Sequence, residues 1–163
     1  MNKFEKISAR RFSADISDNC AYDDIKLPVR ATKNSAGYDF FAPFDFTLAA
    51  GESIKVPTGI RVLLDDDKVL LIAPRSGLGF KYRLQLDNTL GVVDADYSGS
   101  DNEGHIFIKI TNDSKEGKTL SVKKGEAFAQ GIIVQFFKTV DDNATEERNG
   151  GFGSTNKNKI SIK

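Results

Sequence analysis

Short apolar runs, many of them alternating with polar residues and separated by turns rich in glycine and aspartate, dominate this chain. Six runs have this character: Ser53–Val56, Gly59–Leu63, Val69–Ile72, His105–Ile110, Thr119–Val122 and Ile132–Phe137. No stretch of helical length shows a sustained apolar period of ~3.6 residues. Many short strands at regular spacing are typical of an all-β sandwich or barrel. Pro57 follows the first run and predicts a bulge or an edge position, because proline cannot donate to a strand ladder.

The length of 163 residues fits one domain, since domains commonly hold about 100–200 residues. We expect residues 1–140 to form a single β domain, whose first ~20 residues are either a short helix or loose chain. Residues 141–163 are polar, with Phe152 as their lone aromatic, and they predict a flexible C-terminal tail.

Composition and charge exclude several classes of function. The 23 basic residues balance 23 acidic ones, so the chain is a poor nonspecific binder of nucleic acid. No apolar run approaches the ~18 residues of a membrane span, and Met1–Lys6 lacks the apolar core of a secretory signal. One cysteine and one histidine argue against a zinc cage and against Ser–His or Cys–His catalysis. We therefore expect a cytoplasmic enzyme or binding module, or a nuclear one in a eukaryotic or viral setting.

Five segments, in order, carry residue types that a plain strand or turn does not need. They are Ala36–Ala42, Ala73–Gly79, Leu86–Gly99, Gly125–Gly131 and Arg148–Thr155. Each has a plain structural explanation on its own. In order, these are a surface aspartate in a strand, a simple turn, a hairpin whose aspartates cap the turn, a glutamine whose amide forms structural hydrogen bonds, and a flexible tail with a chance phenylalanine. The chemistry of the five together suggests a site for a phosphorylated ligand.

Anion binding and proton transfer are the functions that these residue types suit. In the second segment Arg75 offers a planar guanidinium that matches phosphate geometry, and two glycines let backbone N–H groups converge on an anion. In the third segment Asn88 offers an amide for a base edge. Asp94 offers a carboxylate that can accept a proton from water. In the last segment, Phe152 among glycines suits stacking on a planar ligand.

Taken in order, the five segments resemble the five motifs of the trimeric deoxyuridine triphosphatase (dUTPase) family, over Lys26 to Thr155. The Gly-Val-Val-Asp-Ala-Asp-Tyr stretch and the Gly-Gly-Phe-Gly-Ser-Thr tail are its most specific parts. The resemblance implies a jelly-roll-like fold and a homotrimer whose active sites are shared between chains. It also implies Mg²⁺-dependent hydrolysis of dUTP to dUMP and pyrophosphate, by water attack at the α-phosphorus. This activity keeps uracil out of DNA and supplies dUMP for dTMP synthesis.

The resemblance also implies roles for individual residues. Asp94 would activate the attacking water and hold the sugar 3′-hydroxyl, and Tyr97 would lie against the deoxyribose. The uracil edge would be read by Asn88 and by the backbone of Gly91, Val92 and Val93. A neighbouring chain would supply the phosphate contacts of Arg75, Ser76 and Gly77. Gln130 would reach the α-phosphate, and Asp39 would act near the metal through water. A closing tail, with Phe152 stacked on uracil, would consist of Arg148, Phe152, Gly153, Ser154 and Thr155.

Two departures from the family pattern stand out. About five extra residues, Ser100–Gly104, follow Tyr97 before the strand expected at His105. The tail places Arg148-Asn149 directly before Gly150-Gly151, one residue shorter than the usual pattern, which makes the phosphate role of Arg148 less secure than the stacking role of Phe152.

Three other functions remain open. One is a dCTP deaminase-like enzyme of the same fold, although that family uses a glutamate base and usually lacks the Asp94–Tyr97 stretch. Another is a noncatalytic nucleotide-sensing module, although a carboxylate near a triphosphate weakens binding. The third is a dUTPase that also binds a protein partner through Ser100–Gly104.

Overall fold

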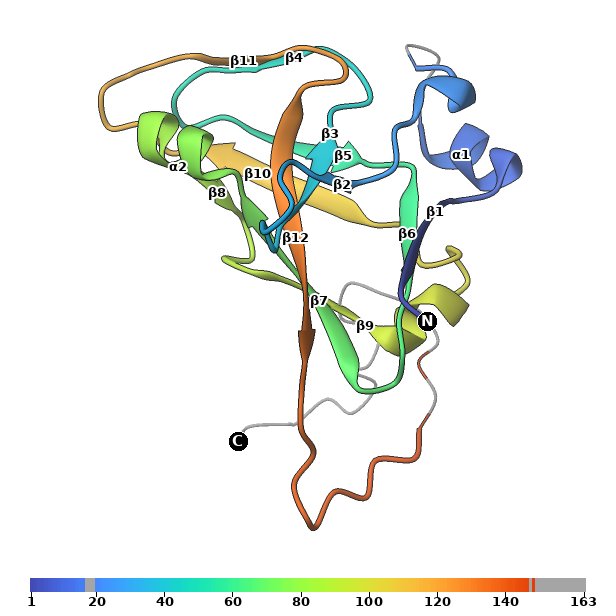
Figure 1. Ribbon diagram of the computed structural model, residues 1–163. Coiled ribbons are helices and arrows are strands. Elements are labelled where there is room, and N and C mark those ends of the chain that lie inside the picture. The colour runs from blue at the N-terminus through green and yellow to red at the C-terminus, as the bar shows by residue number, and fades with distance from the viewer. Residues whose placement is uncertain (17–19, 147, 149–163) are drawn as a thin grey trace, which may run out of the picture.

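The structure is a computed structural model that describes residues 1–16, 20–146 and 148 (Figure 1). Its strands are β1 (Lys3–Lys6), β2 (Val29–Arg30), β3 (Tyr38–Phe41), β4 (Phe46–Leu48), β5 (Ser53–Pro57), β6 (Ile60–Leu63), β7 (Lys68–Pro74), β8 (Leu84–Leu86), β9 (Gly91–Asp94), β10 (Phe107–Asn112), β11 (Leu120–Val122) and β12 (Ala127–Gln135). Its helices are α1 (Ala9–Asp15) and α2 (Ser76–Tyr82), with 3-10 turns η1 (Tyr22–Asp24) and η2 (Ala95–Gly99).

The strands pair antiparallel in four sheets. A five-stranded sheet has the order β2-β3-β12-β7-β9, and a three-stranded sheet has the order β5-β10-β8. Two further pairs are β1-β6 and β11-β4. Figure 1 shows β7 and β12 running along the length of the molecule, with α1 on one side and α2 on the other. Within the described residues the sheets pack as a jelly-roll-like sandwich and do not join into a closed barrel, which confirms the predicted fold class.

Alternation along the strands fills the core between the sheets. Leu70 and Ile72 of β7 and Ile108 and Ile110 of β10 are buried, whereas the residues between them are more exposed. This is the two-residue period of a strand with one buried face. Each such side chain contributes roughly 1.5–3 kcal/mol relative to an exposed one.

Two strands differ in extent from the sequence prediction. The run predicted over Ile132–Phe137 belongs to β12, which begins at Ala127 and ends at Gln135. Gln135 pairs with Lys68, the first residue of β7, so the ladder has no partner further on. Phe136 and Phe137 therefore lie outside the sheet, 39% and 87% exposed. The other strand, β10, begins at Phe107 rather than at His105.

Pro57 lies where its chemistry predicts. It ends β5, which is the edge strand of the three-stranded sheet, and it stands opposite Phe107 of β10. The missing N–H of proline is tolerated there because one side of an edge strand has no partner.

The first residues of the chain are ordered against the domain. Phe4 of β1 pairs with Val62 of β6, and Phe12 and Ile16 are buried. Ser8 caps α1, since its hydroxyl accepts the Arg11 N–H at 3.1 Å. Of the two alternatives for this segment, the structure therefore has the helix, preceded by a strand that the sequence pattern did not reveal.

A buried polar network joins α1 to the loop before β10. His105 is fully buried, and its Nε2 accepts the Gly59 N–H at 2.9 Å. The ring proton therefore lies on Nδ1, which donates to Asp15 at 2.7 Å. Arg11 donates two hydrogen bonds of 2.7 Å to the same carboxylate. The single histidine thus has a structural role.

This network predicts a loss of stability in mild acid. Burial lowers the pKa of His105, although its hydrogen bond with Asp15 opposes the shift. Below the unfolded-state value of ~6.5 the unfolded chain binds a proton that the folded chain resists, so the free energy of unfolding falls by up to ~1.4 kcal/mol per pH unit. Urea unfolding of wild type and His105→Asn between pH 7.5 and 5.5 checks this. The prediction is wrong if both proteins show the same pH dependence.

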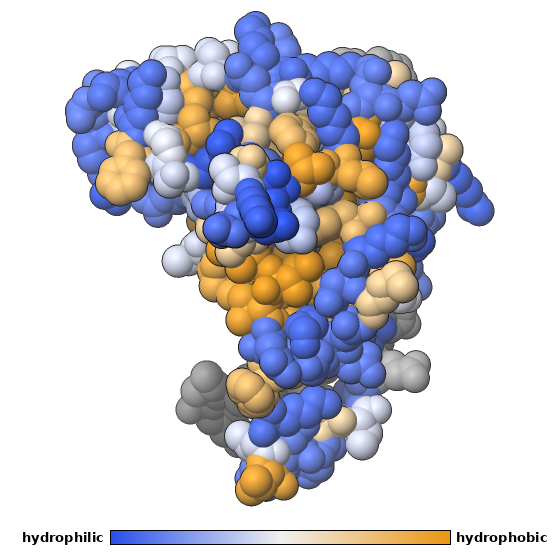
Figure 2. Space-filling view, viewed as in Figure 1, coloured by the Kyte–Doolittle hydropathy of each residue, from blue (hydrophilic) through white to orange (hydrophobic). Residues whose placement is uncertain are grey.

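An apolar area lies on the outer face of the five-stranded sheet. Val69, Leu71, Ile132 and Val134 point away from the core residues that alternate with them, and all four are partly or well exposed. Figure 2 shows apolar side chains gathered in the region that β7 and β12 occupy in Figure 1. Among the described residues, no helix is long and apolar enough to span a membrane.

Candidate active site

The link between β8 and β9 is a tight turn that presents Asn88. Thr89 adopts a left-handed conformation with φ 67°, its N–H bonds the Leu86 carbonyl at 2.9 Å, and the Leu90 N–H bonds the Asn88 carbonyl at 2.7 Å. Positive φ is rare for a β-branched residue, and such outliers gather at functional sites. The predicted hairpin is wrong in one respect. Its two arms do not pair with each other: β8 pairs with β10 in the three-stranded sheet, and β9 pairs with β7 in the five-stranded sheet.

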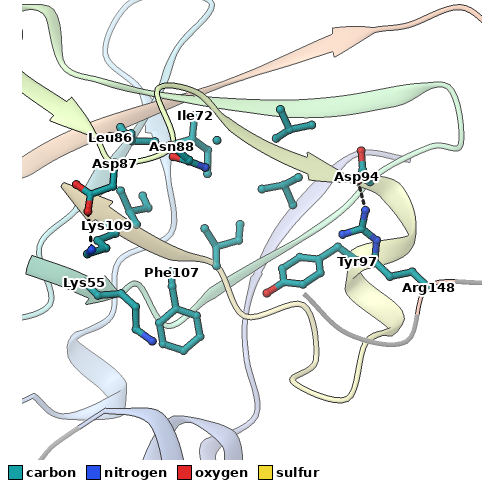
Figure 3. Close-up of a pocket in the computed structure, with 15 residues that line it drawn as sticks. Lys55, Ile72, Leu86, Asp87, Asn88, Asp94, Tyr97, Phe107, Lys109 and Arg148 are labelled. Carbon is teal, nitrogen blue, oxygen red and sulfur yellow. Dashed lines mark hydrogen bonds and ion pairs between the residues drawn. The ribbon is translucent and has the colours of Figure 1, made fainter. Parts of the chain in front are cut away.

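A cavity of about 560 Å³ opens beside this turn (Figure 3). The predicted residues that line it are Asn88, Gly91, Val92, Val93, Asp94, Tyr97 and Arg148. The volume is within the usual range of small-molecule sites, ~300–1,000 Å³. Packing favours glycine at position 91, since a Cβ there would lie 3.0 Å from the Ile72 Cβ, a tight contact. The structure therefore brings the third segment and one tail residue together in one cavity.

Asp94 and Arg148 form one of the charged pairs that line this cavity. The Arg148 guanidinium forms an ion pair with Asp94, lies 3.2 Å from an Asp96 oxygen, and stands over the Tyr97 ring at 6.0 Å. The Asp94 side chain keeps 43% of its surface exposed. Arg148 was predicted to bind phosphate; in this structure its partners are the two carboxylates.

Several cavity residues were not predicted from the sequence. Lys55 and Lys109 face each other across β5 and β10, and both line the cavity. Lys109 forms an ion pair of 2.6 Å with Asp87, and this contact, with Thr111, lowers the pKa of Asp87. The Lys55 ammonium lies 4.8 Å from the centre of the Phe107 ring. In the sequence these lysines are ordinary polar positions of alternating strands, so no signal distinguished them.

The second and fourth segments meet elsewhere on the chain. A hollow of about 230 Å³ is lined by Arg75, Ser76, Gly77, Leu78 and Ala127. Arg75 forms an ion pair of 3.3 Å with Asp39. Ser76 and Gly77 form the first turn of α2, where backbone N–H groups have no partner within the helix. This hollow has the donors that an anion requires.

Gln130 belongs to the same group. It pairs in register with Asp39 of β3 and Ala73 of β7, and its side-chain amide donates to the Pro74 carbonyl at 3.2 Å. A Cβ at Gly37 would lie 2.5 Å from the Gln130 side-chain oxygen, so the glycine makes room for this amide.

The two groups of residues lie at opposite ends of β7. Asp94 stands opposite Val69, whereas Arg75 follows Pro74. At ~3.3 Å per residue, the five steps along the strand from Val69 to Pro74 span about 17 Å. The two hollows share no lining residue. The remaining predicted site residues, Phe152, Gly153, Ser154 and Thr155, lie outside the described part of the chain.

Fold and site together define a jelly-roll-like β protein with a cavity of small-molecule size beside a strained turn. Set apart from it is a second turn whose arginine and backbone N–H groups suit an anion. A dUTPase family model matches residues 23–156. The deoxyuridine 5′-triphosphate nucleotidohydrolase of Lactococcus lactis is 40% identical over 134 residues, which cover 80% of this chain and 88% of that protein. The chain belongs to the dUTPase family.

Solved structures agree with this assignment. The dUTPase of Streptococcus mutans is similar with a TM-score of 0.65 and 31% identity, over 83% of this chain and 97% of that one. A mutant dUTPase of phage phi11 of S. aureus, whose structure describes the coordination of a structural Mg(II) ion, matches in fold with a TM-score of 0.64 and 20% identity, over 90% of this chain and 97% of that one.

Proposed function

We propose that this chain hydrolyses dUTP to dUMP and pyrophosphate, with Asp94 as the base that activates water for attack at the α-phosphorus. As a member of the dUTPase family it is a dUTP diphosphatase, a hydrolase of nucleotide metabolism. The observation that carries the residue assignment is the shared cavity of Asn88, Asp94 and Tyr97. A base-reading amide, a carboxylate and an aromatic ring in one cavity suit a nucleoside whose sugar lies between base and phosphate.

Each side chain has a defined task in this proposal. The Asn88 amide and the backbone of Gly91–Val93 read the uracil edge, and the Tyr97 ring lies against the deoxyribose. Asp94 orients a water molecule and accepts its proton. In-line displacement at phosphorus depends mainly on positioning and on neutralising charge. A positioned base accelerates the reaction ~10²–10⁴-fold, and the phosphate contacts supply the rest of the acceleration.

Mg²⁺ fits this arrangement as an ion carried by the phosphates. It retains several waters and needs only one or two carboxylates from the protein. Among the described residues there is no cluster of three or more histidine, cysteine or acidic side chains that could form a dedicated cage. Asp39, the ion-pair partner of Arg75, would hold the ion through water. When bound, the ion neutralises charge on the triphosphate.

A homotrimer with shared sites completes the proposal. One chain does not bring Arg75, Ser76, Gly77 and Gln130 to the cavity of its own Asp94, because the two groups lie at opposite ends of β7. A neighbouring chain can supply the phosphate contacts. The exposed apolar face of β7 and β12 offers surface for burial between chains. Light scattering at several protein concentrations measures the assembly, and a monomer with full activity contradicts shared sites.

A nucleotide panel tests the function. We expect Mg²⁺-dependent release of pyrophosphate from dUTP, with dCTP and dTTP poor substrates, the latter because its 5-methyl group meets the backbone near Val92 and Val93. Orthophosphate as the product would mean attack at the γ-phosphorus. Ammonia release from dCTP would indicate a deaminase instead, and binding without turnover would indicate a sensing module.

Sugar selection is expected to depend on Tyr97. Its ring is only 7% exposed and forms part of the cavity wall, so it leaves no room for a ribose 2′-hydroxyl. Tyr97→Ala should lower the ratio of kcat/KM for dUTP to that for UTP by about tenfold to a hundredfold. Steady-state kinetics with both nucleotides measure this ratio. A variant that rejects UTP as well as wild type does would remove Tyr97 from sugar selection.

A further inference from the structure

The Tyr97 hydroxyl is held from two sides by the residues that follow it. It donates to the His105 carbonyl at 2.9 Å and accepts from the Asn102 amide at 2.8 Å. The Asn102 side-chain oxygen accepts the Gly104 N–H at 3.1 Å, which fixes the orientation of the amide. In Figure 3 the hydroxyl points away from Asp94 and Arg148, so these bonds hold the ring at the end remote from the reacting groups.

The Ser100–Gly104 segment that supplies Asn102 is itself anchored. Glu103 adopts φ 61°, and its carboxylate accepts the Ser8 N–H at 2.7 Å and the Ser8 hydroxyl at 2.6 Å. Gly104 has φ 72°, and a Cβ there would lie 2.7 Å from the Ser98 Cα. Left-handed residues persist where surrounding contacts hold them. Because Ser8 also caps α1, the helix and this segment support each other.

The same loop is fixed at its other end by the buried His105 side chain. Its hydrogen bonds to Asp15 of α1 and from the Gly59 N–H hold the residue whose carbonyl accepts the Tyr97 hydroxyl. Both partners of the hydroxyl therefore belong to elements tied to α1. A ring held in this way meets a substrate in one orientation, and steric rejection of a larger substrate depends on such rigidity.

We propose that Asn102 is a positioning residue for sugar selection: its bond to the Tyr97 hydroxyl fixes the ring plane that excludes a ribose 2′-hydroxyl. The proposal rests on the proposed function, because it concerns the choice between dUTP and UTP in that site. It gives the Ser100–Gly104 segment a task within the enzyme. The segment and α1 together hold the Tyr97 ring, which forms one wall of the proposed sugar subsite.

The test compares two variants that remove the contact from opposite sides. Asn102→Ala removes the amide, and Tyr97→Phe removes the hydroxyl while keeping the ring. Asn102→Ala should lower the dUTP-to-UTP ratio of kcat/KM by about fivefold, the factor expected for one hydrogen bond. Tyr97→Phe should lower it at least as much, because it also breaks the bond to the His105 carbonyl. The change should come mainly from faster use of UTP. The double variant should show little further loss, because both changes break the same contact.

Asn112→Ala is the matched control. Asn112 is also a buried asparagine, at the far end of β10, and its amide donates to the Leu48 and Lys118 carbonyls at 2.9 and 2.8 Å. Its loss should lower Tm and leave the nucleotide ratio unchanged. The ratio therefore separates a positioning role from a general loss of stability.

The outcomes distinguish the inference from the function on which it rests. An unchanged ratio in folded Asn102→Ala or Tyr97→Phe overturns the inference, as does an equal fall in Asn112→Ala. If Asn102→Ala does not fold, Asn102→Ser decides the question, because its shorter side chain keeps an oxygen for the Gly104 N–H but loses the amide that donates to the Tyr97 hydroxyl. A wild-type protein that releases no pyrophosphate from dUTP contradicts the proposed function instead.

Discussion

Asp94→Asn is expected to keep nucleotide binding and to lose at least ~10²-fold in turnover of dUTP, the lower end of what a positioned base contributes. The substitution preserves the shape of the side chain but removes its ability to accept a proton from water. It also removes the ion pair with Arg148, which should not weaken the binding of a triphosphate. Pyrophosphate release measures turnover, and calorimetry with an α,β-imido analogue of dUTP measures binding.

Asp96→Asn is the matched control for this experiment. Asp96 is a second carboxylate near Arg148, at 3.2 Å, but it does not line the cavity and its side chain is 55% exposed. The control should retain most of the turnover. Near-normal rates in Asp94→Asn, or equal losses in both variants, would show that Asp94 is not the base.

Removal of the chain after Asp142 is expected to abolish most turnover while leaving the domain folded. From Phe136 to Glu146 the residues are exposed and belong to no sheet, so the loss of this part of the chain removes little of the core. The deletion removes Arg148 together with Phe152, Ser154 and Thr155. Base–aromatic stacking is worth ~1–3 kcal/mol, and closure that excludes water adds to it. The deletion should therefore cost more than Phe152→Ala alone.

Phe137→Ala is the control for Phe152→Ala. Phe137 is a phenylalanine that also follows the last strand, before the tail begins, and it is 87% exposed. Its loss should leave turnover close to that of wild type. Circular dichroism and Tm establish that the shortened chain folds. Full activity in that chain would exclude the tail from the mechanism.

Mixed assemblies reveal whose tail closes which site. Asp94→Asn chains and shortened chains are unfolded and refolded together, and pyrophosphate release from dUTP is measured. Recovered activity would mean that an intact tail serves the Asp94 of a different chain. Without recovery, in mixed trimers confirmed by mass, each tail serves its own chain, as the contact of Arg148 with Asp94 within one chain would suggest.

The alternation of apolar and polar residues was sufficient to predict most strands and the all-β class. It did not predict the ends of strands that are set by tertiary pairing. The ladder with β7 ends β12 at Gln135, and no local pattern marks that point. His105 was assigned to a strand because its neighbours are apolar, whereas its burial depends on Asp15, 90 residues away in sequence. Such long-range hydrogen bonds leave no periodic signal.

The candidate site was predictable to the extent that its chemistry is local. Asn88, Asp94 and Tyr97 lie within ten residues of one another, and the structure places all three in one cavity. Lys55, Phe107 and Lys109 join them only because β5 and β10 pair in a particular register. The support of Tyr97 by Asn102 was equally hidden, since the sequence shows only a polar loop.

The pairing of Arg148 with Asp94 bears on how the enzyme tells its substrate from its product. A triphosphate brings several negative charges, so we expect it to compete strongly for the guanidinium and to release the carboxylate as the nucleotide enters. A monophosphate brings fewer charges and competes less well. After the reaction, we expect the carboxylate to recapture its counter-ion, which helps to expel dUMP. The ligand-free site thus pairs Asp94 with an arginine of its own chain, and we expect each turnover to exchange one anion for another at that arginine.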